Sequence, residues 1–274
     1  MKLKRFLGFL GGVFCCGMVL FAVLTGCDFN VMHWHAQSTA DSIKIQRYDR
    51  VESRYLTTGD FAALQEMNTV YTRETRALIE NVLRLGSVAE ADINKRLLEF
   101  YRDSTLQNVI YAAESEFADM EDLNKELRAA FVTLHEHIPE MRIPKFYAQI
   151  GAFDESIIID DYDVGISLDK YLGPEYPAYE RFYDKEQRKT MKREYIVPDC
   201  IVFYLWSLYP PQNMYMLTQY ERDMHIGKFM WVANYVTKKP RFKSDSVEKV
   251  EKFMHQNPKV TIPQLLKMQT FQRF

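Results

Sequence analysis

The sequence predicts an α+β fold that is predominantly helical around a small central β-sheet. Apolar residues recur at three- and four-residue steps over most of the chain, which is typical of amphipathic helices. Between residues 143 and 172 this period changes to alternation and short β-branched runs, which indicates strands. Of the 274 residues 47% are hydrophobic and 26% are charged, which excludes a polytopic membrane protein and wholesale disorder. No linker interrupts residues 41–274, so we expect them to form one domain.

Residues 1–26 predict a signal peptide, because three basic residues open the chain and residues 6–24 carry no charge. The uncharged run ends in Leu24-Thr25-Gly26-Cys27, which is similar to the lipobox of bacterial lipoproteins. An apolar residue stands three before the cysteine, a small residue two before it and a glycine immediately before it. This resemblance implies cleavage between Gly26 and Cys27, and lipidation of Cys27 by a diacylglycerol and a fatty acid such as palmitate.

A single uncleaved membrane helix is the alternative for this segment, since residues 6–26 are about long enough to span a bilayer. If cleavage occurs, the loss of the three basic residues leaves 32 basic against 37 acidic residues, a net charge of −5. Such a domain is not drawn to anionic headgroups, so the anchor must hold it at the membrane. Residues 27–40 are polar, and we expect them to form a tether. The formal charge of −2 for the whole chain argues against a nucleic-acid partner.

The first helical pattern begins after Asp60, which can cap a helix, and Gly86 can end it. One stripe at helical spacing joins the two, formed by Phe61, Leu64, Asn68, Tyr71, Thr75, Leu78, Val82 and Leu85. We therefore predict one helix between Asp60 and Gly86. Further amphipathic patterns predict helices over residues 88–101, 104–117 and 120–137.

The middle of the chain predicts strands, and the remainder predicts helices. The three short strands cover residues 146–150, 156–159 and 164–168. Gly151 and the acidic run at 160–163 supply the turns between them. Helices resume over residues 176–187, 197–209 and 212–236. Two patterns typical of capping boxes, at 245–248 and 261–264, open short helices.

Three groups of residues have side chains of the types that bind metals, but none has the spacing or context of a known site. In His135-Glu136-His137 the imidazoles are two residues apart, whereas helical zinc sites use histidines four apart on one face. His33 and His35 could chelate a metal only if the tether were ordered. The run Asp160-Asp161-Tyr162-Asp163 could offer carboxylates to Ca²⁺, but it lacks the closing glutamate of an EF-hand, and a hairpin turn needs the same residue types. We expect no metal site.

Cys200 is the one candidate nucleophile. It follows Pro198 and Asp199 at the start of an apolar helix, where the helix N-terminus lowers the pKa of a thiol. No partner histidine is identifiable from the spacing, and an apolar helix more often carries a buried, inert cysteine. The sequence contains no Walker loop and no G-x-S-x-G, G-x-G-x-x-G or H-E-x-x-H motif. We therefore predict no catalytic residue and no cofactor.

Aromatic residues are numerous in the second half of the chain. They could line a groove that binds a glycan or a peptide, or they could pack a core between helices and a small sheet. The residues concerned are Tyr171, Tyr176, Tyr179, Phe182, Tyr183, Tyr204, Trp206, Tyr209, Tyr215 and Tyr220.

The block Gly165-Ile166-Ser167-Leu168-Asp169-Lys170-Tyr171-Leu172-Gly173 resembles the central motif of the gliding-motility lipoproteins called GldB. In that family a similar block precedes a tyrosine-rich helix, an I-V-P helix start and a later GK segment. Ile196-Val197-Pro198 and Gly227-Lys228 match the last two, and the lipobox at Cys27 is shared. The resemblance covers residues 130–236. Its motif residues in this chain are Gly165, Leu168, Asp169, Tyr171, Leu172, Gly173 and Pro198.

This resemblance implies a non-enzymatic lipoprotein of the cell membrane or outer membrane that faces the periplasm and contacts envelope proteins in a gliding or secretion-type machinery. Two other classes stay open: a metal-dependent peptidase relative or atypical hydrolase that uses carboxylates such as Asp160, Asp161 or Asp169, and a glycan- or peptide-binding lipoprotein. The chain also has a distant similarity to zinc-peptidase-like (zincin) folds. In such a fold the helix over residues 198–208 takes the place of the metal helix, and because it carries no histidine the peptidase activity would be lost.

Overall fold

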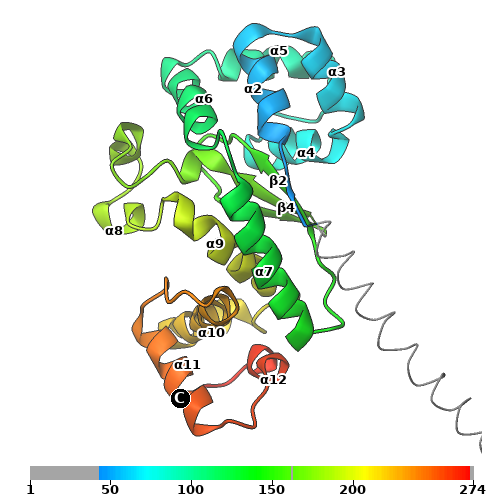
Figure 1. Cartoon of the computed structure of the whole chain (residues 1–274). Coiled ribbons are helices and arrows are strands. Elements are labelled where there is room, and N and C mark those ends of the chain that lie inside the picture. The colour runs from blue at the N-terminus through cyan, green and yellow to red at the C-terminus, as the bar shows by residue number, and fades with distance from the viewer. Residues whose placement is uncertain (1–42, 162, 272–274) are drawn as a thin grey trace, which may run out of the picture. The chain divides into compact units, whose positions relative to one another are not determined.

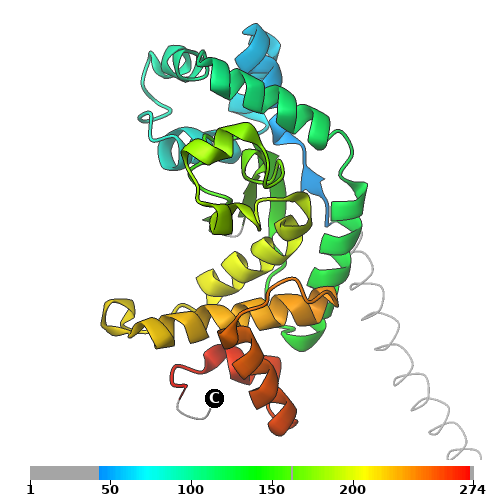
Figure 2. The same cartoon turned by 90° about the vertical axis from the view of Figure 1, so that its left-hand side faces the viewer.

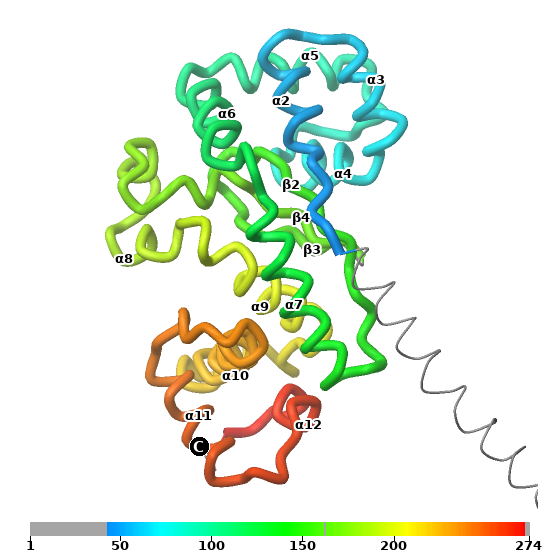
Figure 3. The backbone as a smooth tube through the Cα atoms, viewed as in Figure 1, coloured from blue at the N-terminus to red at the C-terminus, as the bar shows by residue number. Residues whose placement is uncertain are grey.

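Helices surround a four-stranded mixed sheet in the computed structural model, which describes residues 43–161 and 163–271 (Figure 1). The strands are β1 (Ile45–Gln46), β2 (Lys145–Gln149), β3 (Ile157–Asp160) and β4 (Asp163–Ser167). Their order in the sheet is β1-β2-β4-β3, with β1, β2 and β4 parallel and β3 antiparallel to β4 at one edge (Figure 3). The predicted α+β class is therefore confirmed.

Local sequence explains the β3–β4 hairpin. Three consecutive isoleucines form most of β3, and β-branched residues suit a pleated, buried surface. Asp161 lies in the turn with a φ of 49°, a left-handed conformation that aspartate tolerates better than most residues. The acidic run at 160–163 thus serves the turn, as the sequence indicates. Arg73 forms ion pairs with Asp161 and Asp163, and the pair with Asp161 is exposed, so it contributes little to stability.

The helices between β1 and β2 form the upper part of the view in Figure 1, and the last of them runs down the middle of it. They are α2 (Tyr48–Thr58), α3 (Phe61–Thr69), α4 (Thr72–Arg76), the π-helical η1 (Ala77–Val82), α5 (Ile93–Phe100), α6 (Ser104–Glu116) and α7 (Glu121–His137). The predicted helices at 104–117 and 120–137 are confirmed. The helix predicted over 88–101 begins later, at Ile93, after a turn.

The single helix predicted between Asp60 and Gly86 is wrong, although Asp60 does cap α3 by accepting a hydrogen bond from the N–H of Ala62. The helix ends at Thr69, and its ladder is interrupted where the Thr75 hydroxyl donates to the carbonyl of Met67 over 2.9 Å. The ring of Tyr71 then contacts the buried ring of Tyr48 on α2, with centroids 5.4 Å apart. Tertiary packing therefore overrides the helical period at this point.

The helices after β4 lie beside the sheet and below it in the view of Figure 1. They are the 3₁₀ turns η2 (Leu168–Lys170), η3 (Pro177–Arg181), η4 (Arg193–Tyr195) and η5 (Met214–Met216), and the helices α8 (Lys185–Arg188), α9 (Ile196–Leu208), α10 (Gln219–Thr237), α11 (Asp245–Gln256) and α12 (Ile262–Lys267). The helix predicted over 176–187 is replaced by η3 and α8, because Asp184 and Gln187 form a capping box that starts a new helix. The box predicted at 261–264 is confirmed, whereas α11 is capped by Ser244 instead.

The helices stack in layers below the sheet (Figure 2). The apolar helix α9 packs against β3 and β4, α10 packs against α7 and α9, and α11 and α12 pack against α10. One continuous core of buried apolar side chains runs through these layers. Within residues 43–161 and 163–271, no helix combines the length and the apolarity needed to cross a bilayer.

Candidate functional site

The family-like motif lies directly after β4, beside the backbone that leaves β2. Three side chains from three distant parts of the chain bind this backbone. Glu52 of α2 accepts a hydrogen bond from the N–H of Ile150 over 2.9 Å, and the hydroxyl of Tyr101 donates to the Ile150 carbonyl over 2.5 Å. Asp169 of η2 accepts from the N–H groups of Gly151 and Phe153 over 2.6 and 2.8 Å. Because buried peptide groups must be paired, these contacts decide where the segment lies.

The two carboxyl groups of this cluster are completely buried. Burial raises the pKa of Asp169 above its ordinary value, although the N–H groups that it binds act in the opposite direction. Burial also raises the pKa of Glu52 well above its ordinary value, and the negative charges of Asp49 and Asp169 add to the shift. Each group therefore holds a proton more readily than an exposed acid does.

Lys170 and Tyr183 secure the far end of the same segment. The Lys170 ammonium donates to the Phe153 carbonyl over 3.0 Å and to the Tyr183 hydroxyl over 2.7 Å, and the Tyr183 hydroxyl also bonds the Phe153 carbonyl. Phe153 has a φ of 68°, which is unusual for a bulky side chain. The surrounding hydrogen bonds hold this strained conformation in place.

Tyr171 connects the motif to the apolar helix α9. Its hydroxyl donates to the carboxylate of Asp199 over 2.8 Å. Loss of hydration raises the pKa of Asp199 from its ordinary value to about 7, and the bond from Tyr171 only partly offsets this shift. Pro198 is the third residue of α9, where its missing N–H leaves no helical hydrogen bond unmade.

The other motif residues are Gly165, Leu168, Leu172 and Gly173, and the packing and backbone conformation at each position explain them. A Cβ atom on Gly165 would lie 2.6 Å from the ring of Tyr147, so only glycine allows the tyrosine of β2 to cross β4. Gly173 has a φ of 105°, a conformation open to glycine. Leu168 is fully buried, and the N–H of Leu172 donates to the Tyr179 hydroxyl over 2.9 Å. That hydroxyl in turn donates to the Asp169 carbonyl over 2.6 Å, which closes the turn around the motif.

Gly227 and Lys228 fix the C-terminal helices. A Cβ atom on Gly227 would lie 2.6 Å from the Cβ of Ser246, so glycine permits the close crossing of α10 and α11. The Lys228 ammonium is buried and donates to the carbonyls of Leu266 and Met268, each over 2.8 Å. Burial lowers the pKa of Lys228 to about 8. The lysine satisfies carbonyls at the end of α12 that the helix leaves unpaired.

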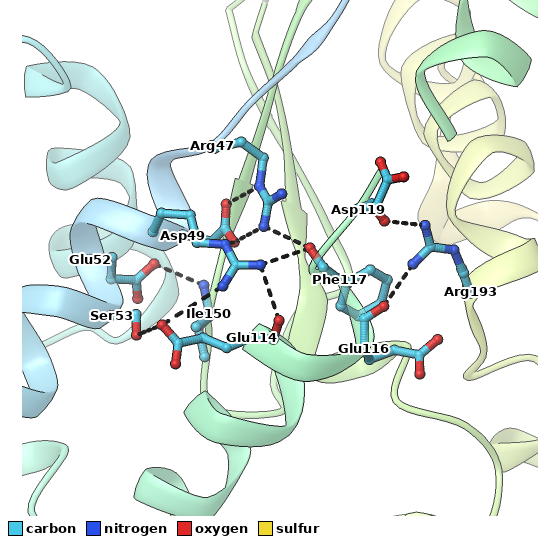
Figure 4. A network of polar contacts seen from close by, with 11 residues as sticks. Arg47, Asp49, Glu52, Ser53, Glu114, Glu116, Phe117, Asp119, Ile150 and Arg193 are labelled. Atoms are coloured by element: carbon cyan, nitrogen blue, oxygen red, sulfur yellow. Dashed lines mark hydrogen bonds and ion pairs between the residues drawn. The ribbon is translucent and has the colours of Figure 1, made fainter. Parts of the chain in front are cut away.

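Three arginines, Arg47, Arg50 and Arg193, bind the corner between α6 and α7 (Figure 4). Arg47 and Arg50 both donate to the carbonyl of Phe117, over 2.8 and 2.9 Å, and Arg193 donates to the carbonyl of Glu116 over 2.9 Å. Cations at a helix C-terminus satisfy free carbonyls and favour the helix dipole. The corner therefore joins α2, near the start of the described chain, to the segment before α9.

The remaining candidates from the sequence do not assemble into a reactive centre. Cys200 is fully buried and unpaired, and burial raises the pKa of its thiol well above its ordinary value, which confirms the interpretation as a buried cysteine. His135 contacts the carbonyl of Met141 over 3.1 Å, and His137 packs against the ring of Tyr235. Among the residues that the structure describes, no group of three His, Cys, Asp or Glu side chains is arranged to hold a metal ion.

The aromatic residues of the second half are divided between core and surface. Tyr171, Tyr179 and Tyr204 are buried, whereas Phe182, Tyr215 and Tyr220 are exposed. Those near a cavity are distributed over separate shallow hollows rather than one pocket: Phe182 and Tyr183 line one, Tyr176 a second and Tyr220 a third. The predictions for Gly26 and Cys27, for the 27–40 tether and for His33 and His35 concern residues outside the described range.

The sequence predicted the motif but not Glu52 and Tyr101, which bind the same backbone segment as Asp169. Glu52 lies 98 residues from Ile150, and Tyr101 lies 49 residues from it. One signal was available: Tyr48, Val51, Glu52 and Tyr55 share one face of a helix. A carboxylate within an otherwise apolar face indicates a buried, hydrogen-bonded acid.

The fold and this site define a mostly helical α+β scaffold in which the motif residues bind internal backbone and helices. A family model described as "Gliding motility protein GldB" matches residues 33–240 of the 274. The chain therefore belongs to the GldB family of gliding-motility lipoproteins. Searches of curated proteins and of solved structures each return no significant match. The likeness to zinc-peptidase folds stays a prediction.

We predict that Asp169→Asn lowers the free energy of unfolding by about 2–4 kcal/mol, because an amide can accept from only one of the two N–H groups and turns a donor toward the other. Urea unfolding followed by circular dichroism measures this change. Asp161→Asn in the exposed turn is the control, and we expect it to change the free energy by about 0.5 kcal/mol or less. Equal stability of the D169N variant and the parent would contradict the assigned role.

We predict that Asp199 makes folding stability fall as pH rises from about 4 to 7. Its pKa in the folded chain is about 7, so the folded state keeps a proton that the unfolded state releases, and ionisation costs stability. The Asp199→Asn variant escapes this cost. Its advantage over the parent should therefore grow by about 4 kcal/mol between pH 4 and pH 8 in urea unfolding, at about 1.4 kcal/mol for each unit of the pKa shift. Exposed Asp223→Asn is the control, and a pH-independent difference for D199N would overturn the assignment.

Proposed function

We propose that this protein is a non-enzymatic lipoprotein, anchored by Cys27 in the cell membrane or outer membrane, that contacts other envelope proteins in a gliding or secretion-type machinery. Membership of the GldB family and the lipobox-like residues that end at Cys27 support the anchor. The chain then faces the periplasm, with residues 27–40 as the tether. No step of this role requires a metal or a cofactor.

The motif supports a scaffolding role because its polar groups are already used inside the molecule. Asp169 binds two backbone N–H groups, Tyr171 binds Asp199, and Lys228 binds two carbonyls. A catalytic acid or base needs a free position within reach of substrate. These residues instead keep sheet, α9 and C-terminal helices in register, which is what a binding platform requires.

The observation that carries the contact role is an exposed apolar segment between α9 and α10. Residues 200–220 contain no charged residue, although 26% of the chain is charged. The first part of this run forms α9, and the rest lies at the surface, where Met216 is 84% exposed and Tyr215 is completely exposed. Leu208, Met214 and Tyr220 are also exposed. Several exposed apolar side chains on one uncharged segment are typical of a docking site for another protein.

For the anchor, we predict that Cys27→Ala abolishes labelling by a fatty acid and leaves the precursor uncut, because only the thiol of Cys27 can form the thioether. Metabolic labelling with an alkyne analogue of palmitate measures the first effect, and the mass of the isolated chain measures the second. Cys15→Ala together with Cys16→Ala is the control and should leave both unchanged. Labelling that survives in the C27A variant would refute the anchor.

For the contact segment, we predict that a photo-crosslinking residue at position 215 captures an envelope protein in intact cells. The same residue at position 61 is the control, since Phe61 is 75% exposed on the distant helix α3. Tyr215→Ser with Met216→Ser should lower capture from a crosslinking position retained at 220 by about tenfold or more, because central apolar contacts dominate interface energies. Equal capture at 215 and 61 would count against this surface.

A further inference from the structure

Charge is distributed very unevenly along this chain. Residues 238–274 contain nine basic and three acidic residues, whereas residues 27–237 contain 23 basic and 34 acidic residues. The C-terminal part is therefore strongly basic on an otherwise acidic protein. Such an asymmetry within one domain indicates a surface that attracts an oppositely charged partner.

A groove lies at this basic end, between the last turns of α10, the loop after it and α11. Its volume is about 1000 Å³. Trp231, Phe242 and Val247 form an apolar floor, and each of them is buried except for a small exposed part. Met254 and Val260 extend the apolar lining. The indole N–H of Trp231 is bonded to Glu251, which fixes the ring in the floor.

Lysines stand at the rim of the groove. Lys238, Lys243 and Lys252 are exposed, and none of them forms an ion pair with any residue of the described chain. Lys239 also lines the groove, but it pairs with Glu126 over 2.6 Å. On the acidic side, Glu248 and Glu251 line the groove, and the bond from the neutral indole of Trp231 leaves the charge of Glu251 in place. Three unpaired lysines against two glutamates give the rim a net positive charge of one.

These features select one class of occupant. A flat bilayer cannot enter a groove, so its headgroups would meet the rim lysines and leave the apolar floor uncovered. An amphipathic peptide segment can place apolar side chains on the floor while its carboxylates meet the lysines. The length of α11, 12 residues, provides a wall of about three turns for such a segment.

We propose that the groove between α10 and α11 binds an acidic amphipathic segment of a partner protein, with its apolar side chains against Trp231, Phe242 and Val247 and its carboxylates against Lys238, Lys243 and Lys252. This inference rests on the proposed function, because it names the chemistry of one envelope contact. It is separate from the exposed apolar segment at 208–220, which carries no charge.

The test uses the full lipoprotein in detergent and an 18-residue helical peptide with leucines on one face and glutamates on the other. The triple variant Lys238→Glu, Lys243→Glu and Lys252→Glu should weaken peptide binding by about tenfold or more, and added salt should weaken binding to the parent. The matched control is Lys249→Glu, Lys259→Glu and Lys267→Glu, which changes the charge of the same region equally. Fluorescence anisotropy gives the affinities, and the indole N–H resonance of Trp231, but not that of Trp206, should shift on binding.

Equal weakening of peptide binding by the two triple variants would overturn the proposed binding site, because it would show that the peptide is attracted by the overall charge of the region alone. Tighter binding of vesicles that contain phosphatidylglycerol than of the peptide would also overturn it, as would equal binding of a peptide with lysines in place of the glutamates. These outcomes leave the anchor at Cys27 and the crosslink at position 215 unaffected. Loss of fatty-acid labelling or of envelope contacts would instead contradict the proposed function.

Discussion

The structure depends on the pairing of one buried stretch of backbone, where the chain leaves β2. A parallel strand that ends inside the protein exposes N–H and C=O groups to an apolar interior, and each unpaired group costs about 1–3 kcal/mol. Asp169, Glu52 and Tyr101 remove this cost for residues 150–153. Because the three side chains come from η2, α2 and the end of α5, their bonds also fix these elements around the sheet. The position of α9 follows, since Tyr171, two residues after Asp169, binds Asp199 of that helix.

Buried acids in this molecule are stabilised in two different ways. Asp49 is 1% exposed and is neutralised by a paired guanidinium, with Arg47 Nη2 and Asp49 Oδ2 2.7 Å apart. Glu52 and Asp169 have backbone N–H groups instead of a cation, and burial raises the pKa of both. Backbone dipoles carry no net charge, so they orient a carboxyl group without fully compensating its ionisation. The backbone N–H groups therefore fix where the carboxyl groups of Glu52 and Asp169 lie, but they stabilise the negative charge less than a cation would. A scaffold requires the fixed position and not the charge.

Sequence periodicity was sufficient where an element is set by its own residues. The strands β2, β3 and β4 and the helices α6, α7 and α9 all lie close to their predicted ranges, because apolar spacing and caps are local. The helix predicted over 212–236 begins later, at Gln219, because Thr218 and Glu221 form a capping box there. It failed at residues 61–82, where contact with Tyr48 interrupts the helix, and at β1, whose two residues pair with a strand a hundred residues later. The motif was recognisable as a block, but its function was not, since the partners Glu52 and Tyr101 are distant in the chain. A hydrogen bond between residues so far apart produces no periodic pattern in the sequence from which it could be predicted.

The interior and the surface of this protein therefore have different roles: the interior keeps the fold, and in the proposed function the surface contacts partners. The motif residues occupy the interior, where a change leaves a polar group unpaired or a ring without space. The family match ends at residue 240, so it includes the apolar segment at 208–220 and α10 but not α11. In the proposed role, the scaffold and the apolar segment belong to the part shared with the family model, whereas the basic groove combines α10 with a helix beyond it. Of the three lysines at its rim, Lys243 and Lys252 lie beyond the matched residues, so in the proposed role they are the charges by which this chain distinguishes its own partner.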